Sequence, residues 1–275
     1  VARIYEVKGR PSVSPLIVHV DSVEMARTLA TKWPDEAGAL ARHYWPGPLT
    51  LVLPKSAAVP DIVTAGLPTV GIRIPAHPVA LELIRLAGVP IAAPSANTFT
   101  RLSPTTADHV RESLGDRVDL ILDAGPTKVG IESTVLTLAV APPRLLRPGM
   151  VTQGDIEKLI GPVRISGRIE NGEGAHSSPG LHHKHYSPTT PLVIVEAGAL
   201  PSGRGVYLWR VQPARTAESV EMPREPEPYA AVLYETLHRA DRKHWDWIAV
   251  EKLPQRPEWA GIADRLARAA SNSLG

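Results

Sequence analysis

Short apolar runs that favour β-strands alternate with segments of helical spacing along residues 1–160. The apolar runs predict strands over Leu16–Val20, Leu49–Leu53, Val70–Ile74, Pro90–Ala93, Asp119–Leu122 and Thr134–Leu138. Helical spacing and capping residues predict helices from Ser22 through Trp33, over Asp35–Trp45 and His77–Ala87, from Thr105 or Thr106 through Leu114, and over Gln153–Ile160. This alternation restricts the chain to an α/β fold, with helices layered on a sheet.

The pattern stops at residue 161 and resumes at residue 191. Residues 161–190 are rich in Gly, Ser, His and Pro, so we expect a linker between a domain over 1–160 and a smaller α/β domain over 191–275. The smaller domain is predicted to contain strands at Pro191–Ala197, Gly205–Trp209 and Trp247–Val250, helices at Tyr229–Ala240 and Gly261–Ala270, and a proline-rich loop at Pro213–Pro228.

Composition excludes several classes of protein and site. The chain has 275 residues, of which 43% are hydrophobic, and a net charge of +2, which permits contact with phosphates without demanding nucleic acid. It has no Cys, so a disulfide, a thiolate zinc site and a Cys nucleophile are excluded. No apolar run approaches the roughly 18 residues that span a bilayer, and no signal peptide is visible, so we expect a cytoplasmic location and no membrane partner.

Several short polar motifs could carry chemistry, and each also has a structural interpretation. Lys8-Gly9-Arg10-Pro11 ends a predicted helix, so its cations either complement the helix dipole or clamp phosphate. Ser95 and Asn97 follow a strand, where they form an ordinary turn or bind a ligand at the sheet edge. Arg147 at a strand end is either solvated or functional.

Two polar residues interrupt apolar strands. His19 shares a strand face with Ile17, opposite Val18 and Val20, and is either a structural group or a ligand-binding one. Arg73 needs a partner when buried, either a protein carboxylate or the carboxylate of a ligand. A histidine cluster in the linker is interpreted as solvated rather than metal-binding, since no Cys or acidic residue stands beside it: His182, His183 and His185.

Taken in order, these motifs resemble those of a known family, and the resemblance covers essentially the whole chain. The matching strings are Lys8–Pro11 with Pro15–His19, Trp45–Thr50, Thr69–Pro75 with His77-Pro78, Ala93–Asn97, Ser103–Thr105, Gly130–Val135, Leu146–Gly149, Ser178–Gly180, His185–Pro188, Tyr229 with Leu233-Tyr234, and Ala263–Ala270. They are similar to those of the two-domain threonylcarbamoyl-AMP synthases, which join a YrdC-like domain to a smaller C-terminal domain. The resemblance implies a twisted open sheet with flanking helices and a Rossmann-like C-terminal domain.

The resemblance also implies an activity. The family makes threonylcarbamoyl-adenylate from L-threonine, bicarbonate or CO2, and ATP with Mg2+, and releases pyrophosphate. A separate tRNA threonylcarbamoyl transferase complex then modifies tRNA, so we expect at most a weak tRNA contact. The implied catalytic residues are Lys8 and Arg10; the implied ATP-binding residues are Arg10, Ser14, Thr69, Ser95, Asn97, Ser103, Arg147 and Tyr186; and the implied threonine-binding residues are His19, Arg73, Ala93 and Ser133. Tyr186 would fold over the nucleotide, and no protein metal site is implied.

The sequence departs from the family pattern at a few positions. Val13-Ser14 stand where the family has Asp-Asn, and Thr98–Thr100 follow Asn97 where it often has Ser-Gly. The chain begins at Val1 inside a predicted helix and lacks the family's first strand and Pro-Thr-Glu-Thr segment, so we expect a fragment with weak ATP binding and poor catalysis. The alternatives are an RNA-binding module and an inactive regulatory paralogue of the same fold.

Overall fold

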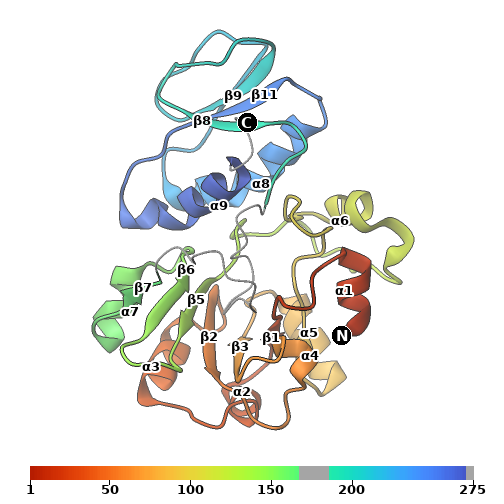
Figure 1. The fold of residues 1–275 in the computed structure, drawn as a ribbon, viewed down its shortest axis with the longest axis vertical. Helices are drawn as coiled ribbons and strands as arrows, with labels where there is room; N and C mark the ends of the chain where they lie inside the picture. Colours follow the sequence, from red (N-terminus) through yellow and green to blue (C-terminus); the bar gives the residue numbers. More distant parts are fainter. Residues whose placement is uncertain (167–185, 271–275) are drawn as a thin grey trace. The chain divides into compact units, whose positions relative to one another are not determined.

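A computed structural model describes residues 1–166 and 186–270, which belong to two compact units (Figure 1). The first unit comprises Val1–Ser95 and Glu132–Leu181, and the second comprises Ala96–Ile131 and His182–Gly275. Residues 96–131, which lie inside the predicted domain 1–160, therefore group with the C-terminal residues. The predicted domain boundaries themselves stay a prediction.

The first unit is built on a seven-stranded sheet in the order β4-β1-β3-β2-β5-β6-β7. Its strands are β1 (Ile17–His19), β2 (Leu49–Pro54), β3 (Thr69–Arg73), β4 (Ile91–Ala92), β5 (Thr134–Thr137), β6 (Arg144–Arg147) and β7 (Arg164–Ile165). The sheet is mixed, because β1 and β3, β2 and β5, and β6 and β7 pair in parallel while the other neighbours are antiparallel.

The helices of this unit are short, and half of them have a side-chain N-cap. They are α1 (Ala2–Lys8), α2 (Val23–Thr28), α3 (Asp35–Tyr44), α4 (Asp61–Thr64), α5 (Pro78–Ala87) and α7 (Gln153–Ile160). Ser22 caps α2 by accepting a hydrogen bond from the Met25 amide, as the sequence predicts. Gly9 ends α1 in the left-handed conformation at φ 60°, which turns the chain directly after Lys8.

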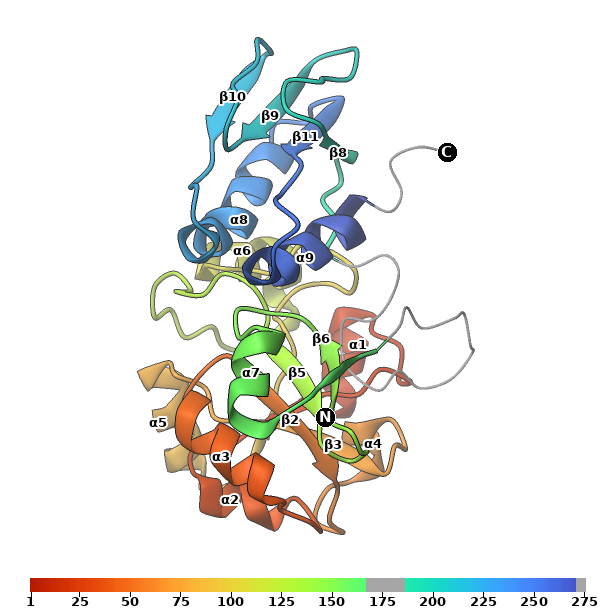
Figure 2. The ribbon, with the colours of Figure 1, turned by 90° about the vertical axis from the view of Figure 1, so that its left-hand side faces the viewer.

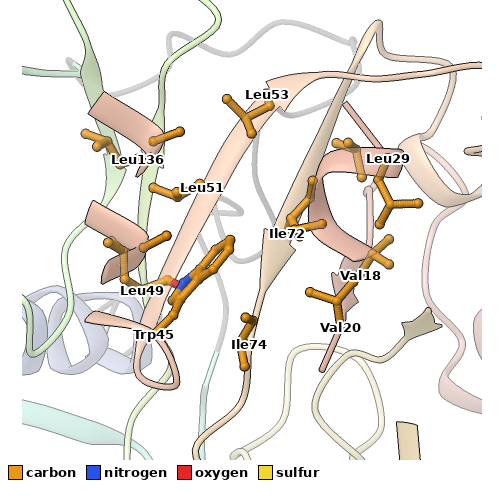
Figure 3. Close-up of a cluster of buried hydrophobic side chains, with 14 of the residues drawn as sticks. Val18, Val20, Leu29, Trp45, Leu49, Leu51, Leu53, Ile72, Ile74 and Leu136 are labelled. Carbon is orange, nitrogen blue, oxygen red and sulfur yellow. The ribbon is translucent and has the colours of Figure 1, made fainter. Parts of the chain in front are cut away.

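Strand alternation separates an apolar face of the sheet from a more polar one. Figure 3 shows the apolar side, where Val18 and Val20, Leu49 to Leu53 in alternation, Ile72 and Ile74 pack together. Side chains from α2, α3 and α7 complete this core, and Figure 2 shows these helices on one side of the sheet. The intervening strand residues therefore point to the opposite face.

The second unit contains a four-stranded parallel sheet in the order β10-β9-β11-β8. Its elements are α6 (Ala107–Leu114), the 3-10 turn Gly115–Arg117, β8 (Leu192–Val195), β9 (Gly205–Trp209), β10 (Glu218–Glu221), α8 (Pro226–Asp241), β11 (Trp247–Glu251), the 3-10 turn Pro257–Trp259 and α9 (Ala260–Ala270). The segment 96–131 packs on α8: a Cβ at Gly130 would collide with the Ala230 carbonyl.

The fold class is confirmed, and some predicted elements are corrected. Asp119–Leu122 forms no strand: Leu120 and Leu122 alternate as in a strand but are exposed, and no described strand pairs with them. β10 lies inside the proline-rich segment predicted as a loop, and β7 lies inside the predicted linker. The helix that begins after Ser22 ends at Thr28 rather than Trp33.

No helix in residues 1–166 or 186–270 is long and apolar enough to cross a membrane. The histidine cluster His182, His183 and His185 lies outside the described residues.

Candidate functional site

The polar face of the first unit's sheet carries a basic group at the ends of two adjacent strands. His19 ends β1 and Arg73 ends β3, and the parallel register places them side by side. Val18 and Ile72, their neighbours, belong to the core, so His19 and Arg73 point to the other face. The Arg73 Nε donates a hydrogen bond to the Gly47 carbonyl at 2.8 Å, which fixes the direction of the guanidinium.

Electrostatics favour an anion beside these two residues. Burial, together with the nearby positive charge of Arg147, lowers the pKa of Arg73 to about 10, so the group stays charged at neutral pH. Burial and Arg73 lower the pKa of His19 to about 4, so this ring is neutral at pH 7. The His19 Nδ1 is buried and has no hydrogen-bond partner among the described residues. Backbone hydrogen bonds with Ile17 and Ile91 oppose the lowering of the His19 pKa, so the case for an anionic ligand rests on the buried cation of Arg73.

A second pair on the same unit joins the entry of β5 to the end of β6. The Arg147 guanidinium, which is buried, donates to the Ser133 carbonyl at 3.1 Å and to its hydroxyl at 3.2 Å. The Ser133 hydroxyl also lies 2.8 Å from that of Thr50. Gly149 makes this arrangement possible, because a Cβ there would lie 2.5 Å from the Thr134 amide nitrogen.

Lys8 and Arg10 form a second basic group near the start of β1. The Lys8 ammonium donates to the Ser95 carbonyl at 2.6 Å, and burial with the charge of Arg10 lowers its pKa to about 7. The Arg10 guanidinium donates to the Ser14 hydroxyl at 2.6 Å and to the Pro15 carbonyl at 3.0 Å. Two buried cations held close together at the end of a helix suit a phosphate-binding role.

Strand direction separates the two basic groups. Thr69 begins β3 while Arg73 ends it, so the two are about 13 Å apart along the strand. Because Ile17 pairs with Gly71, the chain just before β1 lies beside the start of β3, which puts Ser14 and Thr69 at the same end of these strands. The Ala93 amide donates to the Ile17 carbonyl at 3.1 Å, between the two ends.

The remaining predicted residues, Asn97, Ser103 and Tyr186, lie in the second unit. The Asn97 amide donates to the carbonyls of Thr98 and Arg101 at 3.0 and 2.9 Å, which closes a turn. The Tyr186 ring is buried, with the Arg265 guanidinium 5.4 Å above it and the Tyr234 ring 6.0 Å away. Its predicted place over a nucleotide stays a prediction.

Comparison with known proteins identifies the family. A family model named Sua5/YciO/YrdC and described as Telomere recombination matches residues 1–149, and one for the threonylcarbamoyl-AMP synthase C-terminal domain matches residues 151–271. Threonylcarbamoyl-AMP synthase of Bacillus subtilis is 41% identical over 100% of this chain and 84% of its own length. The chain belongs to the threonylcarbamoyl-AMP synthase family. The threonylcarbamoyl-AMP synthase of Pyrococcus abyssi is 39% identical to this chain, and the match covers 98% of this chain and 84% of the relative.

A solved member of the family shares the fold. The crystal structure of Pyrococcus abyssi Sua5 complexed with L-threonine matches with a TM-score of 0.91 and 38% identity, and the match covers 98% of this chain and 84% of that one. The match confirms the fold implied by the resemblance. It leaves the roles of individual residues in this chain as predictions.

Two residues of the site, Thr50 and Gly149, stand in strings that match the family but have no predicted role. Thr50 is typical of a strand residue inside an apolar run, yet its hydroxyl forms a hydrogen bond with that of Ser133. Gly149 reads as a turn residue, yet the backbone at Glu132–Thr134 approaches it closely. Strand alternation gives a signal for Thr50, because Leu49 and Leu51 belong to the core and the residue between them must face the polar side.

Proposed function

We propose that this chain makes threonylcarbamoyl-AMP from L-threonine, bicarbonate or CO2, and ATP, with release of pyrophosphate. The names of relatives that are 41% and 39% identical over nearly the whole chain support this activity. The observation that carries it is the basic group on the polar face of the sheet, where Arg73 and the buried His19 Nδ1 suit an amino acid. The names of these relatives do not favour the alternatives of an RNA-binding module or an inactive paralogue.

In this proposal the threonine carboxylate pairs with Arg73. A charge-assisted hydrogen bond of this kind contributes about 1.5–3 kcal/mol, and the site already favours an anion. The neutral His19 ring offers a hydrogen bond, and Ser133, oriented by Arg147, offers its hydroxyl to the bound amino acid. The backbone at Ala93 also belongs to the threonine-binding set.

ATP is bound through its phosphates by the second basic group. Lys8 supplies a point charge and Arg10 a planar fork, while Ser14, Thr69 and Ser95 supply shorter polar groups. Asn97 and Ser103 of the second unit, together with Arg147 and Tyr186, complete the proposed ATP-binding set. Lys8 and Arg10 are the proposed catalytic residues, because they stabilise negative charge as the phosphates separate.

Mg2+ enters this proposal as part of the MgATP substrate. In residues 1–166 and 186–270 no three His, Cys, Asp or Glu side chains gather in a way that could hold a metal ion. Phosphate and water, which Mg2+ readily accepts, would supply most of the metal ligands. The protein would recognise the complex through the phosphate oxygens.

The reaction needs no covalent intermediate with the protein. The threonine amine adds to CO2 and loses a proton, which gives a carbamate. A carbamate oxygen attacks the α-phosphorus of ATP while the bond to the β-phosphate oxygen breaks, and pyrophosphate leaves. Positioning and charge stabilisation supply the catalysis, which is consistent with a chain that has no Cys.

The product is a reactive mixed anhydride, so an acceptor must follow. We propose a tRNA threonylcarbamoyl transferase complex as the consumer, a cytoplasmic setting, and at most a weak direct contact with tRNA. The net charge of +2 is consistent with such weak contact.

Product detection tests the activity. The protein is incubated with MgATP, L-threonine and bicarbonate, and threonylcarbamoyl-AMP is measured by mass spectrometry beside reactions that omit one substrate at a time. We expect product only in the complete mixture, in step with pyrophosphate. Pyrophosphate release that does not depend on threonine would contradict the proposal.

A further inference from the structure

Two histidine rings stack inside the second unit. His109 of α6 and His238 of α8 lie with ring centroids 3.8 Å apart and an angle of 20° between planes. The His109 Nε2 lies 3.2 Å from a carboxylate oxygen of Glu235, and its Nδ1 accepts a hydrogen bond from the Thr105 amide at 3.2 Å. His109 is buried and His238 is half-buried, and the pair joins α6 to α8.

The same pair holds the loop that precedes α6. The His238 Nε2 lies 3.1 Å from the Ser103 carbonyl oxygen, an acceptor only, so the ring donates this hydrogen bond. The loop is therefore held at Ser103 by His238 and at Thr105 by His109. On its other side the Ser187 amide donates to the Thr100 carbonyl at 2.9 Å.

We propose that His238, stacked on His109, is a positioning residue that fixes the loop 97–105 for binding MgATP. The inference rests on the proposed function, in which Asn97 and Ser103 of this loop bind ATP. A loop held before binding loses less conformational freedom when the ligand arrives, so the affinity for ATP is higher. Through His238, helix α8 thus supports nucleotide binding, although His238 itself does not contact the nucleotide.

The arrangement requires an unprotonated Nδ1 on His109 and cannot tolerate a charge on both rings. A proton on the His109 Nδ1 would direct an N–H at the Thr105 N–H and remove the acceptor. Two charged rings at 3.8 Å would repel each other. Burial lowers the pKa of both rings, so both are neutral at pH 7.

Charges around the pair come from both helices. Glu235 on α8 and Asp108 and Glu112 on α6 raise the pKa of His109, while Arg242, just after α8, lowers it. Arg242 forms an ion pair with Glu112 at 2.7 Å, which reduces the effect of both charges on the pKa of His109. Because burial holds both pKa values below the ordinary histidine value of about 6.5, we expect the ATP affinity that depends on the pair to be lost only as the pH falls well below 6.5.

Three substitutions of His238 separate the hydrogen bond from packing. His238→Gln keeps a donor for the Ser103 carbonyl, His238→Phe keeps a stacked ring without the donor, and His238→Ala removes both. Arg239→Ala, an exposed neighbour on α8, is the matched control. Calorimetry measures the dissociation constants of MgATP and of L-threonine for each folded variant at pH 7.5.

We expect His238→Ala and His238→Phe to weaken MgATP binding about five- to tenfold, the effect of one lost hydrogen bond. His238→Gln and Arg239→Ala should stay within about twofold of the wild type, and L-threonine affinity should be unchanged in all four. Lowering the pH well below 6.5 should weaken MgATP binding more in the wild type than in His238→Gln, because His238→Gln cannot form a pair of charged rings.

Wild-type MgATP affinity in His238→Ala or His238→Phe would overturn the positioning role. So would equal losses in His238→Gln and His238→Ala, because the hydrogen bond would then be irrelevant. A wild-type protein that forms product, but whose variants bind MgATP equally well, refutes this inference and leaves the proposed function intact. A wild-type protein that binds no MgATP refutes both.

Discussion

Replacing Lys8 by Arg keeps the positive charge of this position and removes its ability to gain a proton near neutral pH. Burial and the charge of Arg10 lower the pKa of Lys8 to about 7 in the free protein. Phosphates bound beside it would return the pKa toward its ordinary value of about 10.4. Binding of ATP above pH 7 should therefore draw a proton from solvent.

The size of the effect follows from this shift. At pH 8 about nine-tenths of free Lys8 is neutral, so each ATP bound should take up about 0.9 proton. The dissociation constant should rise about tenfold from pH 8 to pH 9, because each unit above the free pKa lowers the charged fraction tenfold. Arg stays charged throughout this range, so Lys8→Arg should show neither effect.

Calorimetric titration with MgATP in buffers of different ionisation enthalpy measures the proton uptake directly. Lys128→Arg, an exposed lysine in the second unit, is the control and should behave as the wild type. Wild-type binding without proton uptake at pH 8 would refute the reasoning. The same uptake in Lys8→Arg would assign the proton to another group.

Other predictions concern the polar face of the sheet. The pKa of His19 is lowered to about 4 in the folded protein, against about 6.5 in the unfolded chain. The free energy of unfolding should therefore fall by about 2 kcal/mol between pH 7.5 and pH 5. In urea titrations over the same pH range, the free energy of unfolding of His19→Phe should fall by about 2 kcal/mol less than that of the wild type. Gly149→Ala should destabilise the protein by about 1–3 kcal/mol in thermal unfolding, because its Cβ would collide with the Thr134 amide. Arg147→Met should raise the dissociation constant of L-threonine about fivefold, since Ser133 loses its two hydrogen bonds from the guanidinium.

Matched controls make these outcomes specific. Gly154→Ala lies at the start of α7, where a Cβ has only a 4.0 Å neighbour, and should not destabilise the protein. An unfolding energy of His19→Phe that depends on pH as strongly as the wild type would show that other groups carry the effect. An Arg147→Met variant that loses ATP affinity but keeps threonine affinity would contradict the orienting role toward Ser133 and leave Arg147 its proposed ATP-binding role alone.

The sequence predicts the sheet well where apolar and polar residues alternate along strands that pack against helices. Val18, Val20 and Ile72 are apolar at alternate positions, so His19 and Arg73 had to face the other side, and the core confirms it. The same rule fails for Asp119–Leu122, because alternation predicts a strand only when a neighbouring strand is there to pair with it.

Other features depend on tertiary contacts that no local pattern contains. β10 was missed because the prolines around it outweigh a short alternating segment. The grouping of residues 96–131 with the C-terminal part rests on packing such as that of Gly130 against Ala230. The histidine pair joins residues 109 and 238, which are far apart in the sequence, so spacing could not predict it.

The proposed function places L-threonine at the polar face of the first unit's sheet. Calorimetric titration of L-threonine into the wild type and into Arg73→Met tests this placement most directly. Met has a similar length and no charge, so it removes the proposed partner of the carboxylate. We expect the wild type to bind, Arg73→Met to bind at least about tenfold more weakly, and the exposed control Arg144→Met to match the wild type. Unchanged threonine affinity in Arg73→Met would contradict this assignment.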